Sequence, residues 1–596
     1  MRDLAVHIPT LLPFCLILLA FTLPFLTAFS NQGTAIMSRA SRLKPAVGLG
    51  FAILAFIAVL LSYWASGRSH HVLVGSILPW NDAGGYFFGA LHLLDSGKLT
   101  YWGERRPVYT ALLAGFLSLS GRDLQFALLI QTVFTGAVAF FAARVAALRM
   151  GPPAGLLVFT LLFCFASEYA PTTMTEDAGF LFGTLGITIL WLKAEQRSFA
   201  WFAAAGFLLT LGLLARAGAF FIIPLLLLWA WIAFRDNRGA ALKCVLALLG
   251  GALIAVLLNQ GIYWHVGTGS NFPFSNFSYT FYGLAVGGKG WLQIFADHPN
   301  IMEGGEGVAA PKMFAFAFEQ IMENPLNIVV GYVKNLPYST ARLFDYAPPF
   351  LLLRRLFTLF WLVGLFVAFR RRREPLALLL LMATVGIILS GPFLSDVGSR
   401  VYAATISFDV YLAGLGFSAL IAWLSRTLKQ KFPAWIAPPV LAAQLIGTGS
   451  ALVLLTLAGS FLLPRSQAST LPAFACEAKE TPAVLRLGDE SPLFALRVQP
   501  PFALFPPVVR HGDFVSLIDR AVHLRETLKQ LPPETAVIAG YARKESGAGD
   551  VTWMTWKTKR LPPRGSLVGF CLKPGTHHPL GAAFREPSRV QVLKQD

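Results

Sequence analysis

Long apolar runs, separated by short polar and basic segments, follow one another from the N-terminus to about residue 463. The runs are continuous and lack the apolar-polar alternation of a membrane-spanning β-strand, so each predicts an α-helix. About eleven of them are suited to crossing a bilayer. The predicted spans lie near 46–65, 124–148, 153–168, 176–192, 199–215, 218–234, 242–263, 350–369, 376–394, 402–424 and 438–463.

The polar segments between the runs differ in charge, and this difference predicts their side of the membrane. Lys and Arg collect in cytoplasmic loops of membrane proteins. Such residues cluster at 38–44, 144–149, 193–197, 235–238, 370–373 and 426–431. The acidic motifs fall in the other loops, so the 46–65 span enters from the cytoplasm. Residues 66–122 and 264–346 are then long external loops. Segment 107–120 is apolar but too short to span, and predicts a helix lying at the outer surface.

The two ends of the chain predict separate units around a transmembrane domain at 46–463. In the N-terminal segment 1–45, residues 9–29 are open to three interpretations: an extra span, a cleaved signal peptide, or an over-extended start before Met37. A cleaved signal peptide would place the first basic cluster outside, against the charge rule. The C-terminal residues 464–596 follow the last span and are predicted to lie outside the cytoplasm.

Residues 464–596 have the pattern of a small α+β domain. They contain four proline pairs and an amphipathic stretch at 514–531. Short strand-like runs lie at 535–541, 551–558, 566–572 and 588–593. Cys476 and Cys571 belong to this region, and an oxidising compartment favours a disulfide between them over two free thiols.

Composition agrees with a polytopic membrane protein. Of the 596 residues, 55% are hydrophobic and only 13% are charged, whereas soluble domains carry about 25% charged residues. The formal net charge of +18 is what basic cytoplasmic loops produce, and membrane lipids are the expected surroundings. We therefore exclude nucleic acid as a partner.

Asp82 is the strongest candidate for chemistry. It lies in the segment NDAGGY (81–86), in the first external loop, and a carboxylate near a membrane is costly unless it has a function. Tyr86 follows four residues later, so the two side chains share one face if the segment is helical. The glycines that follow Asp82 leave room for a close approach to that face.

This loop resembles the first periplasmic loop of GT-C glycosyltransferases, in the bacterial branch related to protein O-mannosyltransferases and lipid A aminoarabinose transferases. The resemblance rests on DAGGY (82–86), LDSGKL (94–99) and RPVY (106–109), and continues through PTTMTE (171–176) and LAR (214–216). It covers roughly 46–424 as a pattern of spans and loops. Arg106 stands where the family usually has the first proline of a "PPLY"-like stretch.

The resemblance implies a GT-C-like fold of about eleven to twelve spans in a bacterial inner membrane. It implies a multi-pass enzyme whose active site faces the periplasm or exterior. Such an enzyme transfers a hexose or pentose from a polyprenyl-phosphate sugar donor to a cell-envelope acceptor, which is a lipid, glycan or protein. The anomeric carbon inverts, and the acceptor hydroxyl loses a proton, for which Asp82 is the candidate base. The alternative for Asp82 is a helix cap at the membrane surface.

Other acids have both a structural and a functional interpretation. Glu176 begins a span, where an acid stabilises the helix dipole, or it is a second acid that binds the acceptor or an optional divalent cation together with Asp82. Glu168 is its substitute. Two carboxylates without histidine do not specify a metal, and no cofactor is required.

Cations are expected to meet the phosphate of the donor. Arg400, Arg216 and Arg106 are candidates, because guanidinium groups bind phosphate through two hydrogen bonds. Lys289 is a further candidate, although its GGKG segment (287–290) does not have the spacing of a nucleotide-binding loop. Snorkelling to the membrane interface is the alternative for Arg400 and Arg216. The aromatic cluster at 272–282 is interpreted as an interface anchor rather than a groove for lipid or sugar.

Two other classes of function compete with an enzyme. A transporter or flippase of lipid-linked glycans is expected to show intramembrane charges or internal repeats, and no repeat stands out. A non-catalytic scaffold would use the C-terminal domain for docking. A polymerase or ligase of lipid-linked glycans is a closer alternative that does not need an acid so early in the chain.

Overall fold

The structure, a computed structural model, describes nearly all of the helical part and most strands of the C-terminal region. The described residues are 8, 11, 12, 15, 16, 19, 45–66, 73–74, 78–79, 81–345, 351–427, 440–462, 474–477, 480–486, 503–510, 535–543, 549–557, 562–563, 566–573, 584–585 and 587–594. The interpretations of segment 9–29 and of Met37 therefore fall almost wholly outside them, as does the amphipathic stretch 514–531.

Each predicted span corresponds to a helix. These helices are α3 (Pro45–Ser66), α7 (Leu124–Met150), α8 (Pro152–Tyr169), α9 (Thr175–Lys193), α10 (Phe199–Ala215), α11 (Ile222–Ala233), α12 (Arg238–Val266), α17 (Leu351–Arg370), α18 (Pro375–Ser390), α19 (Ile406–Thr427) and α20 (Val440–Leu457). Among the described residues, eight helices are long and apolar enough to cross a membrane. The fold class, a polytopic α-helical membrane protein, is confirmed, whereas the number of spans and their orientation stay predictions.

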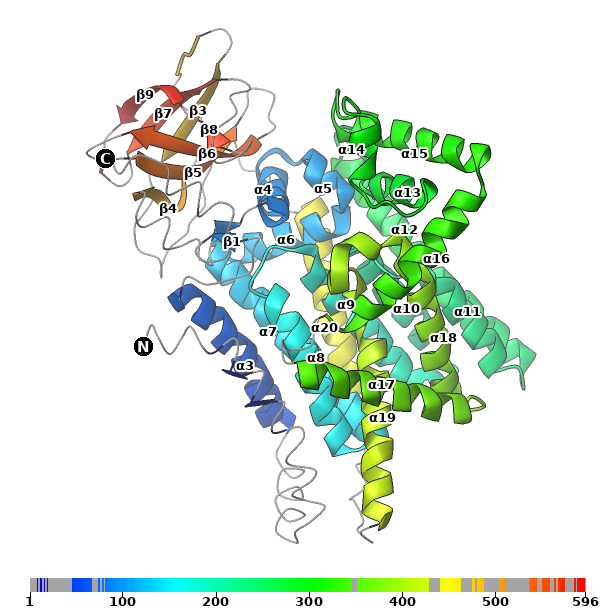
Figure 1. Cartoon of the computed structure of the whole chain (residues 1–596). Helices are drawn as coiled ribbons and strands as arrows, with labels where there is room; N and C mark the ends of the chain where they lie inside the picture. The colour runs from blue at the N-terminus through cyan, green and yellow to red at the C-terminus, as the bar shows by residue number, and fades with distance from the viewer. Residues whose placement is uncertain are drawn as a thin grey trace.

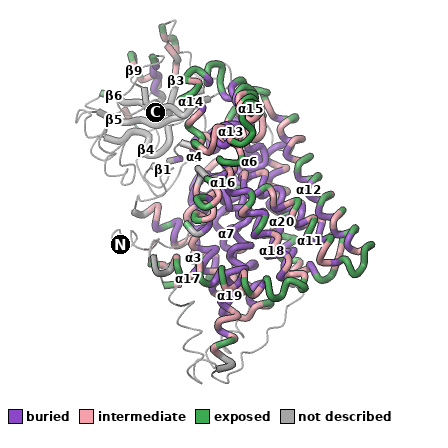
Figure 2. The backbone as a smooth tube through the Cα atoms, turned by 45° about the vertical axis from the view of Figure 1, so that its right-hand side comes forward, coloured by how far each residue is buried: buried purple, intermediate pink, exposed green. Residues whose placement is uncertain are grey.

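The helices pack into one bundle whose interior is buried along its length (Figures 1 and 2). Small residues allow the close contacts, as they do in membrane bundles generally. Gly183 of α9 lies directly against the backbone carbonyl of Ala404, and Gly251 of α12 lies against that of Ala203 in α10. A side chain at either position would push the neighbouring segment away.

The first long loop, residues 66–122, forms helices on top of this bundle. It contains β1 (Leu73–Val74), β2 (Leu78–Pro79), α4 (Asn81–Ser96), α5 (Tyr101–Arg105) and α6 (Pro107–Leu119). α4 ends where Gly97 takes a positive φ of 67°, and the Thr100 hydroxyl accepts a hydrogen bond from Gly103 N at 3.3 Å to start α5.

The expected surface position of segment 107–120 is corrected by the structure. The segment is helical, but α6 is buried from Pro107 to Leu117. It packs between α4 and α20, and the π-helical turn η5 (Ala458–Leu462) that continues α20 also covers it. The segment is apolar because it is enclosed by protein, and sequence alone does not distinguish this burial from burial in lipid.

The second long loop, residues 264–346, is also helical in its described residues. Its helices are α13 (Phe277–Ala285), α14 (Gln293–Asp297), α15 (Glu306–Glu323), α16 (Leu326–Ala341) and the short η2 (Arg342–Phe344). Two short helices, η3 (Gly391–Phe393) and η4 (Ser395–Tyr402), connect α18 to α19 beneath this loop. α13 packs on α15, and α16 packs on η3.

The described strands of the C-terminal region form two antiparallel-rich sheets. Their members are β3 (Thr481–Arg486), β4 (Ala503–Arg510), β5 (Thr535–Arg543), β6 (Gly549–Lys557), β7 (Leu567–Leu572), β8 (Phe584–Arg585) and β9 (Pro587–Lys594). The strand orders are β3-β7-β9 and β4-β5-β6-β8. The four strand-like runs expected from the sequence correspond to β5, β6, β7 and β9. The boundaries of the three proposed domains and the location of this one outside the cytoplasm stay predictions.

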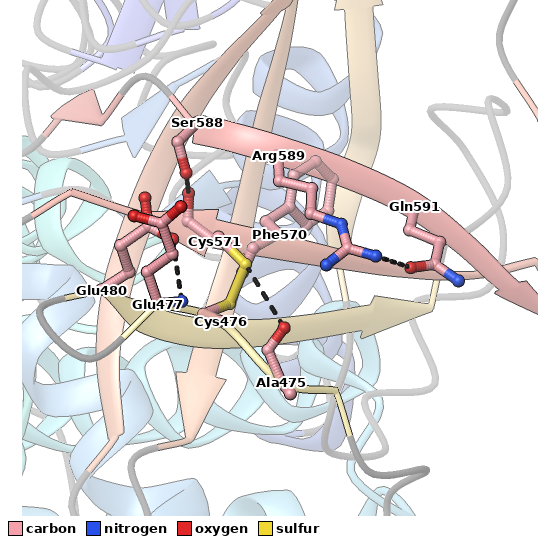
Figure 3. The surroundings of a disulfide bond; sticks show 9 residues. All are labelled: Ala475, Cys476, Glu477, Glu480, Phe570, Cys571, Ser588, Arg589 and Gln591. Carbon is pink, nitrogen blue, oxygen red and sulfur yellow. Dashed lines mark hydrogen bonds between the residues drawn. A yellow bond between two sulfur atoms is a disulfide. The ribbon is translucent and has the colours of Figure 1, made fainter.

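A disulfide joins Cys476, which precedes β3, to Cys571 in β7 (Figure 3). On the other side of β7, Ser588 of β9 donates a hydrogen bond to the carbonyl oxygen of Cys571 at 3.2 Å. The bridge therefore fastens the segment before β3 to β7, the central strand of the three-stranded sheet.

Candidate functional site

A pocket of about 540 Å³ lies where the two long loops meet the top of the bundle. It contains five of the site residues expected from the sequence, which come from segments more than 300 positions apart. Its lining comprises Asp82, Tyr86, Trp102, Arg105, Arg106, Arg216, Ala217, Asn276, Phe277, Tyr279, Thr280, Trp291, Phe295, Leu394, Arg400 and Val401.

Asp82 and Tyr86 enter the pocket from α4. They are one turn apart, as the spacing predicts, and both belong to the lining. The Asp82 side chain is 35% exposed, and its Oδ2 is 3.4 Å from Nη2 of Arg400. Tyr86 is buried and makes an edge contact with Trp102. Burial raises the pKa of Tyr86, so its phenol is neutral and acts as a hydrogen-bonding group.

The space beside Gly85 and Gly89 is filled by other protein side chains and is not open to a ligand. A Cβ at Gly85 would lie 2.6 Å from the indole of Trp102, and one at Gly89 would lie 3.0 Å from the Thr100 hydroxyl. Both contacts come from α5 and its cap. The glycines therefore let α5 pack against α4, which brings Trp102 to the edge of the pocket beside Tyr86.

Glu176 holds two arginines at the bundle side of the pocket. It lies in the first turn of α9 and has no exposed surface. Its carboxylate accepts a hydrogen bond from Nε of Arg400 and lies 3.5 Å from Nε of Arg216. Burial lowers the pKa of Arg400, but Glu176 and Asp82 outweigh it and hold this pKa above its ordinary value. Both guanidinium groups thus face the pocket as cations.

This arrangement does not fit the divalent cation considered for Asp82 and Glu176. The Glu176 carboxylate is engaged by two guanidinium groups, and Arg400 also reaches Asp82. A metal ion between the two acids would lie against a positive charge. The residues are arranged as an acid-arginine network, so we derive no metal chemistry from them.

Arg106 is a third buried cation, contributed by the first loop. Its Nη1 donates to the carbonyl oxygen of Arg105 at 2.7 Å, and its Nη2 donates to Oδ1 of Asn276 at 3.1 Å. Its guanidinium lies 4.5 Å from the ring centroid of Phe274. Burial lowers the pKa of Arg106 to about 10. Its Nε is buried and has no hydrogen-bond partner among the described residues, so one donor stays open beside the pocket.

Two acids that the sequence did not single out fix the loop side. Glu104 is fully buried and accepts hydrogen bonds from the backbone of Thr268, from Gly269 N at 3.0 Å and from Asn271 N at 2.6 Å. It therefore fastens the start of the second loop to α5. In a single sequence nothing separates it from an ordinary surface acid, because its partners are backbone groups 164 to 167 residues away.

Glu306 belongs to the second loop and also fastens this loop to α5. Its carboxylate accepts both Nε and Nη2 of Arg105, and the Ser275 hydroxyl at 2.5 Å. Arg105 in turn lies 3.9 Å from the ring centroid of Trp102. The second loop is thus locked to the arginine pair of the first loop.

The aromatic cluster at 272–282 is one wall of the pocket. Phe277 and Tyr279 belong to the lining, which differs from the expected role as an interface anchor. Trp291 and Phe295 extend the wall, with the rings of Tyr279 and Phe295 stacked at 5.7 Å. The wall comes from α13 and α14, and its aromatic faces suit sugar rings or an apolar chain.

Three expected site residues are not among the lining of this pocket: Glu176, which contacts two of its arginines, and Lys289 and Glu168. Lys289 is exposed in the turn after α13, where its backbone N donates to the Gly283 carbonyl oxygen at 3.0 Å. Glu168 is half-buried near the end of α8. Neither is among the described residues that line the pocket.

Comparisons with known proteins give only distant structural likeness. No family model matches the chain, and no curated protein matches it. Among solved structures, the crystal structure of ArnT from Cupriavidus metallidurans in the apo state is similar, with a TM-score of 0.28 and 16% sequence identity. The match covers 62% of this chain and 77% of that chain. Because the overlap is this limited, we base the proposal below on the pocket.

Proposed function

We propose that this protein is an integral membrane glycosyltransferase that uses a polyprenyl-phosphate sugar as donor. The observation that supports it best is the pocket in which Asp82 faces Arg400, with Arg106 and Arg216 beside them. A carboxylate supplies a base for an acceptor hydroxyl, and guanidinium groups bind a phosphate leaving group. The resemblance of the 82–109 region to GT-C glycosyltransferases points to the same reaction.

The reaction is a single displacement at the anomeric carbon. The acceptor oxygen forms a bond to this carbon, while the bond from the carbon to the phosphate oxygen breaks. The phosphate leaves with the electron pair, and Asp82 takes the hydroxyl proton. The anomeric configuration inverts because the two bonds lie on opposite faces of the sugar.

Arg400 links donor binding to the availability of the base. It contacts both Glu176 and Asp82. A donor phosphate competes with Asp82 for the Arg400 guanidinium, since both are anions. Glu176 stays with Arg400 and Arg216 throughout, and its role is to position them. Donor binding thus releases the Asp82 carboxylate to accept the proton.

The pocket arranges donor and acceptor around Asp82. The arginine groups bind the phosphate, and the aromatic wall of Tyr279, Trp291 and Phe295 lies next to the sugar. The proposed orientation of the pocket toward the periplasm follows from the basic cytoplasmic loops. The acceptor is then a hydroxyl-bearing or amine-bearing component of the cell envelope.

Purified protein in lipid nanodiscs, given radiolabelled polyprenyl-phosphate sugars and an envelope lipid extract, tests the proposal. We expect label to appear in an acceptor product, together with free polyprenyl phosphate. In proteoliposomes, movement of intact donor between leaflets without product would instead identify a flippase. Joining of whole lipid-linked glycans, with single sugars unused, would identify a polymerase or ligase.

A further inference from the structure

The helix α16 of the second external loop is amphipathic, but its exposed face is apolar and its buried face is small and polar. The helices of soluble proteins have the reverse arrangement. Its exposed residues recur at helical spacing and are apolar: Leu326, Val329, Val330 and Val333 are between 55% and 69% exposed. Its buried face is small and polar, with Gly331 and Ser339 enclosed by protein. A helix in contact with water has the opposite arrangement.

The apolar stripe of α16 continues the outer surface of a candidate membrane span. Tyr332 donates a hydrogen bond to the carbonyl oxygen of Leu389 in α18 at 2.9 Å, and its ring packs on Phe393. On α18 itself, Val385 and Leu389 are exposed. Figure 1 shows α16 below α13 and α15, beside the upper part of α18. The outward faces of both helices therefore form one apolar surface.

The remaining residues of α16 suit the boundary between lipid and water. The helix has no acidic residue, and Lys334 is its one charged residue. At its C-terminal end the Arg342 guanidinium lies 4.0 Å from the ring centroid of the exposed Tyr338, and Tyr and Arg are typical anchors at a membrane surface. With 16 residues the helix is about 24 Å long, so it is too short to cross the bilayer.

We infer that α16 lies at the boundary between lipid and water on the outer face of the membrane, with its Leu326–Val333 stripe in contact with phospholipid acyl chains. This goes beyond the proposed function and is independent of the reaction. Part of the second external loop is then a membrane-bound element rather than a solvent-exposed one. The stripe continues the lipid-facing surface of α18, which is why lipid is the occupant rather than a second copy of the chain.

The position of α16 fixes the depth of the pocket. On its inner side the backbone of Ser339 accepts a hydrogen bond from the Tyr402 hydroxyl at 3.3 Å, and the Ser339 side chain lies against Gly391. These contacts hold the segment from η3 to η4, which carries Arg400. A helix bound to the membrane surface therefore sets the height of Arg400 above the bilayer.

Site-specific fluorescence in single-copy nanodiscs tests this inference without any assay of activity. The three free cysteines, Cys15, Cys164 and Cys244, are replaced by alanine, and a single cysteine at Val330 carries an environment-sensitive NBD dye. The lipids are phosphatidylethanolamine and phosphatidylglycerol, with or without a nitroxide-labelled phosphatidylcholine. Leu257→Cys, on the exposed face of α12, and Asn300→Cys, in the exposed turn before α15, are the lipid-facing and water-facing controls.

We expect Val330→Cys to resemble Leu257→Cys: emission at shorter wavelength and loss of most fluorescence when the nitroxide lipid is present. Asn300→Cys should emit as in water and keep its fluorescence. The inference is wrong if the dye at position 330 reports water and ignores the nitroxide lipid. It is also wrong if the emission is shifted but not quenched by the lipid, because protein would then cover the stripe.

Discussion

The bundle side and the loop side of the pocket both present arginines, but different contacts hold them. On the bundle side, Glu176 lies in the first turn of a helix and pairs with Arg216 and Arg400, so three charges stabilise one another in a buried place. On the loop side, Glu306 also pairs with Arg105, whereas Glu104 accepts hydrogen bonds from backbone and hydroxyl groups of the second loop. The Glu176 arrangement depends on charge, whereas the Glu104 arrangement depends mainly on geometry.

This difference indicates which acid influences the reaction and which acid holds the loops in place. On the bundle side Arg400 reaches Asp82 directly, and a change there alters the charges that meet a substrate. The acids on the loop side are one step removed, since they hold the segments that carry Arg105, Asn276 and the aromatic wall. Substitutions can therefore separate the two sides by their effects on stability, turnover and donor binding.

The largest effect is expected from neutralising the acid on the bundle side. Glu176→Gln leaves two buried guanidinium groups without their anion, and breaking a buried pair in this way typically costs about 3–5 kcal/mol of folding free energy. Glu104→Gln should cost less, about 1–3 kcal/mol, because its partners are backbone N–H and hydroxyl groups and Gln keeps an acceptor oxygen for them. Thermal unfolding of both variants in one detergent measures the difference. An equal loss for both would show that the two sides are held in the same way.

The next effect concerns turnover. Asp82→Asn keeps the shape of the side chain and removes the base, so transfer should fall by about 10²-fold or more. Donor binding should survive, because a carboxylate does not attract phosphate. Asp95→Asn, on the same helix and paired with Arg122, is the matched control with unchanged transfer. If Asp82→Asn folds and transfers at the parental rate, Asp82 is a helix cap.

A smaller effect is expected on donor affinity. Arg400→Lys keeps a positive charge beside Glu176 but loses the planar fork that binds phosphate through two hydrogen bonds. The dissociation constant for a polyprenyl phosphate should rise about tenfold, which corresponds to about 1.4 kcal/mol. Arg354→Lys, on α17 and outside the pocket lining, is the control. An unchanged dissociation constant, measured by equilibrium binding in nanodiscs, would remove Arg400 from the phosphate site.

The smallest effect is expected at Lys289, which is exposed and is not among the residues that line the pocket. Lys289→Ala should change both the rate of transfer and the donor dissociation constant by less than about twofold, since surface substitutions away from a site usually have small effects. Steady-state transfer kinetics measure both quantities. A large loss would mean that the site extends beyond the pocket described above.

The sequence predicts the helices well because their apolar runs are long and continuous. It also identifies Asp82, Tyr86, Arg106 and Arg400 as site candidates, since charged groups beside a membrane are costly. It does not identify Glu104, because the hydrogen-bond partners of this residue lie far away in the chain, in another loop. It also fails for α6, because burial in protein and burial in lipid produce the same apolar pattern.

A structure of the Asp82→Asn protein bound to a polyprenyl-phosphate sugar tests the central claim most directly. The variant should bind the donor without consuming it. The account predicts the phosphate within hydrogen-bonding distance of Arg400 and of at least one of Arg106 and Arg216, with the anomeric carbon facing residue 82. A donor whose phosphate lies away from these three arginines, or whose sugar lies outside the pocket, would contradict it.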